Sequence, residues 1–209
     1  MAMDRYDSRS ISLAVTLAGI AGFVDAVGFL SLGNVFVSFM SGNSTRLAVA
    51  ISESRFDYAG LLLGVILLFV VGVVVGSIVG KRAKRRRSSI LRTVAGLLIL
   101  AVIAHHFGEY KIGTALMVLA MGCENAIFQS EGEVIVGLTY MTGTLVRLGN
   151  RIAARLSGDK SASWSPYVLL WLGLVTGATL GGFGDKYMGS LSLVIPVIVC
   201  VGLSVSRES

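Results

Sequence analysis

Two short polar segments, roughly 100 residues apart, share the pattern Met-hydroxyl-Gly-polar-x-x-Arg within a largely apolar chain. Their members are Ser41, Gly42, Asn43 and Arg46 in the first segment, and Thr142, Gly143, Thr144 and Arg147 in the second. The glycines permit sharp turns, and the arginines offer a rigid charged fork suited to carboxylate or phosphate groups. These segments therefore predict a binding site for a small polar solute with an anionic group. The alternative is an ordinary amphipathic helix whose arginine reaches the membrane interface.

Ionisable and amide side chains inside apolar runs form a second group of candidates. Asp25 interrupts the first apolar run, where a carboxylate is costly and usually faces a cavity or a partner. We interpret it as a proton or cation site, as a counter-ion to a bound solute, or as the ion-pair partner of Arg46 or Arg147. Glu124 and Asn125 occupy the equivalent place in the second half. Asn125 is uncharged where the first half has Asp25. Glu124, one residue before it and about 100° round a helix, could supply the charge instead.

Composition separates this chain from soluble domains, because only 14% of its residues are charged and 54% are hydrophobic. Soluble domains carry about 25% charged residues. Six apolar runs approach the roughly 20 residues that a membrane-spanning helix needs; they cover about 11–30, 58–80, 90–104, 112–128, 164–183 and 188–205. The polar segments lie in two weaker stretches, 35–51 and 134–152, which we expect to be broken or re-entrant. The sequence thus predicts an all-α integral membrane protein with about six transmembrane helices.

A basic cluster between the second and third runs sets the expected orientation. Its members are Lys81, Lys84 and Arg82, Arg85, Arg86 and Arg87. By the positive-inside rule this loop is cytoplasmic and touches anionic lipid headgroups, and we prefer that reading to nucleic-acid binding. With six spans, both termini are then cytoplasmic, as expected for a multi-pass protein of a bacterial inner membrane.

An internal repeat divides the chain into two membrane halves, 1–87 and 88–209, of one domain. The matching positions are Gly22, Asp25 and Ala26 with Gly122, Asn125 and Ala126; Ser38–Asn43 with Thr139–Thr144; and Gly72, Gly76 and Lys81 with Gly177, Gly181 and Lys186. An odd number of spans per half makes the halves inverted repeats, with one additional polar segment in each. Such repeats are typical of secondary transporters, whose sites lie near the midplane.

The paired motifs also resemble a known family. Gly22–Phe29, Val35–Asn43 with Arg46-Leu47, and Asn125-Ala126 with Tyr140–Gly149 are similar to those of the YoaK family of small bacterial transmembrane proteins of unknown function. Ser41 stands where the family pattern leads us to expect a threonine, so that a hydroxyl is kept. The resemblance implies a membrane protein and supplies no substrate.

Other features point away from enzymes and metal sites. The sequence contains no P-loop, no HExxH motif and no nucleophile elbow, so we expect no catalytic residues, no cofactor and no metal. His105, His106 and Glu109 are interpreted as part of a loop between two spans. Cys123 and Cys200 lie inside apolar runs, which does not suggest a disulfide framework.

The sequence therefore favours a small secondary transporter with a midplane site built from the polar segments, Asp25, Glu124 and Asn125. A channel of the same architecture and a membrane scaffold or regulator without transport remain as alternatives. The glycine ridges 72–80 and 173–181 are interpreted as close-packing surfaces within the chain or in a homodimer.

Overall fold

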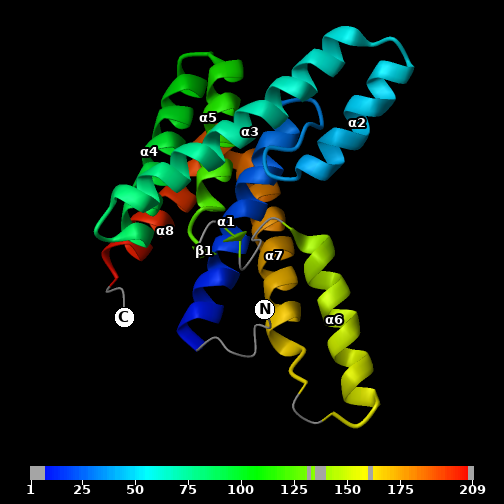
Figure 1. Ribbon diagram of the computed structural model, residues 1–209. Helices are drawn as coiled ribbons and strands as arrows, with labels where there is room; N and C mark the ends of the chain where they lie inside the picture. The colour runs from blue at the N-terminus through cyan, green and yellow to red at the C-terminus, as the bar shows by residue number, and fades with distance from the viewer. Residues whose placement is uncertain (1–7, 131–132, 135–139, 160–161, 207–209) are drawn as a thin grey trace.

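The computed structural model describes residues 8–130, 133–134, 140–159 and 162–206. Within these residues the regular secondary structure is helical apart from one short antiparallel pair of strands (Figure 1). The elements are α1 Ser8–Ser31, α2 Met40–Ser52, α3 Phe56–Arg82, α4 Arg86–His106, α5 Tyr110–Glu124, β1 Gln129–Ser130, β2 Glu133–Val134, α6 Met141–Leu156, α7 Ser165–Met188, the 3-10 helix η2 Gly189–Leu193 and α8 Val194–Val205.

Each of the six predicted apolar runs contains a helix. Among the described residues, four helical stretches are long and apolar enough to cross a membrane: Ser8–Ser31, Phe56–Arg82, Arg86–His106 and Ser165–Val205. The last of these contains α7, η2 and α8, and Figure 1 shows that the chain turns back between α7 and α8. Helices α5 and α8 have 15 and 12 residues, fewer than the roughly 20 that a full span needs.

Helices α1 and α7 pack side by side in the same direction. Gly177 lies against the backbone of Gly19, and Gly181 lies against the backbone of Phe23, so that a methyl group at either glycine would overlap the facing backbone. Because residue numbers rise together along both helices, the two helices are parallel. The absence of side chains at these positions lets the helix axes approach closely.

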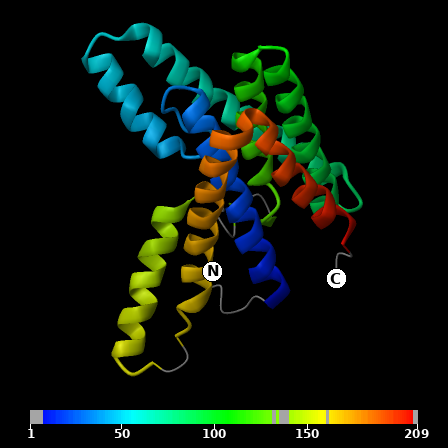
Figure 2. The ribbon, with the colours of Figure 1, turned by 180° about the vertical axis from the view of Figure 1, so that it is seen from behind.

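Helices α3 and α5 form a second parallel pair through the equivalent positions. Gly72 lies against the backbone of Leu119, and Gly76 lies against the backbone of Cys123. In both views of the ribbon, α1 and α7 rise while α3 and α5 descend (Figures 1 and 2). Each pair therefore joins one helix of the first half to one helix of the second half.

The two polar segments form helices that run in opposite directions, with α2 rising and α6 descending (Figures 1 and 2). After α1, Gly33 and Asn34 take positive φ angles of 63° and 70°, and residues 35–39 lie outside any helix before α2 begins at Met40. The interruption in the stretch 35–51 thus precedes Gly42, which lies within the first turn of α2. Helix α6 likewise runs through Gly143, whereas Thr139 and the rest of 135–139 lie outside the described residues.

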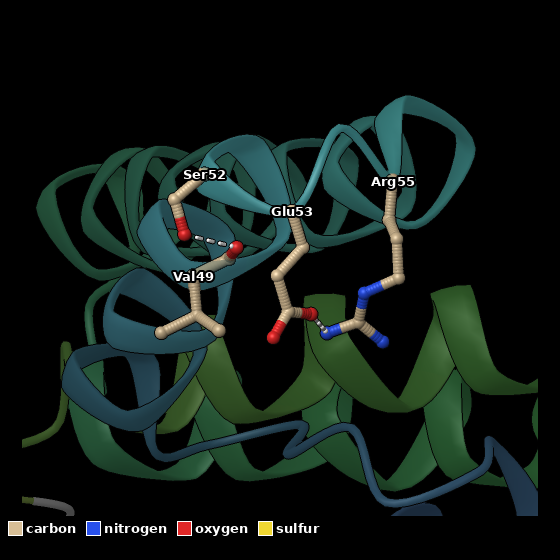
Figure 3. A network of polar contacts seen from close by, with 4 residues as sticks. All are labelled: Val49, Ser52, Glu53 and Arg55. Carbon is tan, nitrogen blue, oxygen red and sulfur yellow. Dashed lines mark hydrogen bonds and ion pairs between the residues drawn. The ribbon is translucent and has the colours of Figure 1, made fainter.

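Two further contacts orient the ends of the bundle. Near the basic cluster, the Ser88 hydroxyl donates to the backbone oxygen of Ser204 over 2.6 Å, and Arg87 donates to the Ser206 hydroxyl over 3.3 Å. The end of α8 therefore lies beside the start of α4. At the α2–α3 turn, Arg55 and Glu53 form an exposed ion pair of 2.6 Å (Figure 3).

The histidines differ from their predicted loop position, because both lie in the last turn of α4. His105 is buried, and its Nδ1 lies 2.8 Å from the backbone oxygen of Ala101. The helix continues this far because the preceding residues 94–104 are apolar and pack on α5. Only Glu109 lies outside a helix, directly before α5.

Candidate functional site

A small pocket joins the two polar segments. Its volume is about 130 Å³, and it is lined by Ser38, Phe39, Met40, Ser41, Phe69, Tyr140, Met141 and Thr142. The residues come from the start of α2, the start of α6 and the middle of α3. The tertiary fold therefore brings together two motifs that are separated by roughly 100 residues in the sequence.

The pocket lies at the N-termini of α2 and α6. The first turn of any helix leaves backbone N–H groups without intrahelical partners, and neither of these helices has a side-chain cap. Both N-termini carry partial positive charge. Because the hydroxyl residues Ser41 and Thr142 line the same pocket, its walls combine hydrogen-bond donors with the positive ends of two helix dipoles.

Aromatic rings shape the pocket, and the two glycines make room for them. Phe39 and Tyr140 precede α2 and α6 as their N-cap residues. The ring of Phe39 lies over Gly42 and the ring of Tyr140 lies over Gly143, where an added methyl group would overlap the ring. A side chain at either glycine would therefore displace the ring that lies against the first helical turn.

Asp25 holds the segment that leads into α2. Its Oδ1 accepts hydrogen bonds from the backbone N–H groups of Val37, over 2.8 Å, and Ser38, over 2.7 Å. Among the described residues it forms no ion pair with Arg46 or Arg147. Asp25 does not line the pocket itself. It holds the backbone of Ser38, and Ser38 does line the pocket.

Asn43 anchors the same segment from α2. Its buried amide accepts a hydrogen bond from the Phe36 N–H over 3.1 Å and donates one to the Phe36 carbonyl over 2.7 Å. Arg46 lies with its guanidinium 5.4 Å from the ring centroid of Phe29 and 5.0 Å from that of Phe36. Asn43 through its amide hydrogen bonds and Arg46 through its cation–π contacts therefore stabilise the segment that leads into α2. Neither residue lines the pocket.

In the second motif, only Thr142 and Met141 reach the pocket. Thr144 is buried, and its hydroxyl lies 3.4 Å from the Tyr140 carbonyl as a donor. Arg147 is exposed on α6. Asn125 donates to the Met121 carbonyl over 2.9 Å within the last turn of α5. Of the predicted residues in the second half, Thr142 lines the pocket, whereas Thr144, Arg147 and Asn125 do not.

Glu124 occupies a separate place in the core. Its side chain is fully buried, and neither carboxyl oxygen has a hydrogen-bond partner within the described part of the chain. The equivalent residue of the first half is Val24, which is also fully buried. A buried polar group without a hydrogen-bond partner lowers the stability of the fold. Glu124 is therefore less favourable at this position than the apolar Val24 is at its own.

Sequence reasoning did not select Phe39, Phe69 and Tyr140, which form much of the pocket wall. The position of Phe39 and Tyr140 directly before the matching Met residues was a usable signal, since both halves place an aromatic ring there. Phe69 lies in a uniformly apolar run and carries no such signal.

Comparison with known proteins agrees with this architecture. Residues 13–206 match the family described as "Protein of unknown function (DUF1275)". The chain is 32% identical over 200 residues to the UPF0700 transmembrane protein RA0705 of Rhizobium meliloti (strain 1021), covering 96% of this chain and 87% of that protein. It is 26% identical over 220 residues to the UPF0700 transmembrane protein YoaK of Bacillus subtilis (strain 168), covering 97% and 95% respectively.

No solved structure matches the chain. The match to the family extends over both halves and over both polar motifs, which confirms the resemblance carried by those motifs. The helices that are long and apolar enough to cross a bilayer agree with the description of both relatives as transmembrane proteins. The chain therefore belongs to the YoaK family of membrane proteins of unknown function.

Proposed function

We propose that this protein is a small secondary transporter that carries a small anionic solute through a site between the N-termini of α2 and α6. The observation that carries the proposal is the pocket shared by these two oppositely directed helices. Helix N-termini that line the same pocket attract negative charge without the cost of burying a cationic side chain. Ser41 and Thr142 add hydroxyl donors to the same wall.

The arrangement of the helices supports an inverted-repeat mechanism. The crossed packing of α1 on α7 and of α5 on α3 uses equivalent glycines in the two halves. The pattern of buried and exposed residues along 12–20 is also the same as that along 112–120. In the proposal, six spans form two inverted halves around the pocket, and a movement of one half relative to the other opens the pocket to alternate sides.

The dimensions of the pocket limit the solute class. A volume of about 130 Å³ lies below the 300–1,000 Å³ of sites for drug-sized ligands, so the solute is a small inorganic anion or a short carboxylate. Phe39, Phe69 and Tyr140 make part of the wall apolar. This favours monovalent anions that give up water readily over strongly hydrated divalent ones.

A flux assay on purified protein in liposomes tests this proposal. Proteoliposomes loaded with chloride, nitrate or formate are diluted into unlabelled buffer, and anion movement is followed with an ion-selective electrode or a labelled solute. We expect flux of at least one of these anions, and a marked loss in the double variant Ser41→Ala and Thr142→Val. The matched control is Ser44→Ala, because the exposed Ser44 hydroxyl donates to the Met40 carbonyl and does not line the pocket.

Exchange measurements separate a transporter from a channel of the same architecture. A transporter accelerates labelled uptake when unlabelled anion is present on the opposite side, whereas a channel conducts without such stimulation. Absence of flux for every anion, with intact protein, would leave a membrane scaffold or regulator and overturn the proposal.

A further inference from the structure

A second and larger hollow lies on the outer face of the α1–α7 pair, apart from the pocket at α2 and α6. Its volume is about 420 Å³, and α8 forms its third wall through Ile195, Pro196 and Val199. Of the described residues that line it, only Thr16 and Thr176 carry a polar side-chain group. The Thr16 hydroxyl is already satisfied by the Ser12 carbonyl, 2.9 Å away, so the surface of this groove is effectively apolar.

Glycines line the groove at positions where the other helix pair carries larger residues. Gly19 and Gly173 line it, and the equivalent residues of the α3–α5 pair are Leu119 and Leu68. The two glycines contribute no side chain to the groove on the α1–α7 face. Something other than this chain's described residues must fill the groove in a membrane, because empty space forfeits dispersion contacts.

The position of the groove relative to the membrane, and a charged residue beyond its end, indicate its occupant. Its walls belong to Ser8–Ser31 and Ser165–Val205, both long and apolar enough to cross a bilayer, so the groove faces hydrocarbon. Arg9 is exposed at the start of α1, seven residues before Thr16 and therefore on the same helix face. At a rise of 1.5 Å per residue, Arg9 lies about 10 Å beyond Thr16 along the helix, towards the headgroup region.

We propose that this groove binds one anionic phospholipid, with an acyl chain between α1, α7 and α8 and the phosphate at Arg9. A basic side chain near the membrane surface attracts anionic headgroups, and a flexible chain conforms to an apolar groove. A second copy of the protein fits less well. A two-fold interface places the same patch on both subunits, and two facing grooves would leave a void rather than fill one.

Native mass spectrometry of the full-length, delipidated protein tests the inference. The protein is titrated with phosphatidylglycerol and, separately, with phosphatidylcholine carrying the same acyl chains. We expect one preferred phosphatidylglycerol, bound about tenfold more tightly than phosphatidylcholine. Thr176→Trp fills the groove and should weaken binding of both lipids. Arg9→Gln should remove the preference for phosphatidylglycerol and leave phosphatidylcholine binding unchanged.

Two matched variants control for general effects on the protein. Thr179→Trp adds the same ring to an exposed position of α7 outside the groove, and Arg55→Gln removes an arginine at the distant α2–α3 turn; both should bind lipid as the unmodified protein does. Equal affinity for the two lipids, or equal behaviour of Thr176→Trp and Thr179→Trp, would overturn the inference. So would a dimer that Thr176→Trp dissociates while lipid binding persists, since the occupant would then be a second copy.

Discussion

Gly177 of α7 lies directly against the backbone of Gly19 in α1, and no side chain fits between them. The same relationship joins Gly72 of α3 to Leu119 of α5. These contacts set the spacing of the two parallel helix pairs, and the pairs in turn position the helices α2 and α6 that meet at the pocket.

Substitution of Gly177 should therefore destabilise the bundle. In Gly177→Ala the new methyl group overlaps backbone atoms, which cannot move aside as a side chain can, and overpacking of this kind costs about 1–3 kcal/mol. Gly182→Ala is the matched control on the same helix, because nothing lies near its added methyl group. Unfolding of the purified protein by titration with SDS should show a loss for the first variant only.

We expect Asp25 to stabilise the fold mainly as a hydrogen-bond acceptor, and its negative charge to matter less. Asp25→Ala leaves the Val37 and Ser38 N–H groups without their acceptor, which costs about 1–3 kcal/mol. Asp25→Asn keeps an oxygen that accepts both bonds and should lose less. Thermal unfolding of the two variants measures the difference, and equal destabilisation by both would show that the negative charge itself matters.

Glu124 offers a test of buried polarity in the core. Glu124→Met replaces a fully buried carboxyl that has no hydrogen-bond partner among the described residues by an apolar side chain of similar length. We expect the free energy of unfolding to rise by about 1–3 kcal/mol. If the proposed transport uses this carboxyl to couple to a cation or proton, the same variant should lose gradient-driven accumulation while exchange persists.

The exposed glutamate at the α2–α3 turn is the control for that variant. Glu53→Gln breaks the ion pair with Arg55 (Figure 3), in which both side chains are more than half exposed. Exposed pairs contribute only about 0–1 kcal/mol. Its stability should therefore change little, and a drop as large as the gain at Glu124 would contradict this assignment of roles.

The glycines under the aromatic rings should affect transport more than stability. A methyl group at Gly42 displaces the ring of Phe39, and one at Gly143 displaces the ring of Tyr140; both rings line the pocket. We expect Gly42→Ala and Gly143→Ala to reduce anion flux in proteoliposomes, with thermal unfolding close to that of the unmodified protein. Gly149→Ala on α6, where the added methyl group meets nothing, should leave flux unchanged.

The position of the C-terminus can be tested by reporter fusion. Ser204 and Ser206 bond to Ser88 and Arg87 beside the basic cluster, and the positive-inside rule predicts that this side is cytoplasmic. A green fluorescent protein fused after Ser209 should fluoresce, and alkaline phosphatase fused there should be inactive. Phosphatase inserted after Gly108, between α4 and α5, should be active, and the opposite pattern would reverse the orientation.

The membrane character, the helices in the apolar runs and the equivalence of the two polar motifs can all be predicted from the sequence alone. Apolar run length and repeated spacing are local properties, readable without knowing what packs on what. Which polar groups share a pocket depends on the packing of the helices and cannot be predicted from local sequence. Asp25 and Arg46 are the charged candidates of the first half, yet Asp25 accepts hydrogen bonds from the backbone and Arg46 lies over two aromatic rings. Ser41 and Thr142 line the pocket. The set of residues that meet at the pocket depends on how α2 and α6 are oriented. The α1–α7 and α3–α5 pairs set that orientation, and these pairs are held by long-range contacts between glycines and facing backbone.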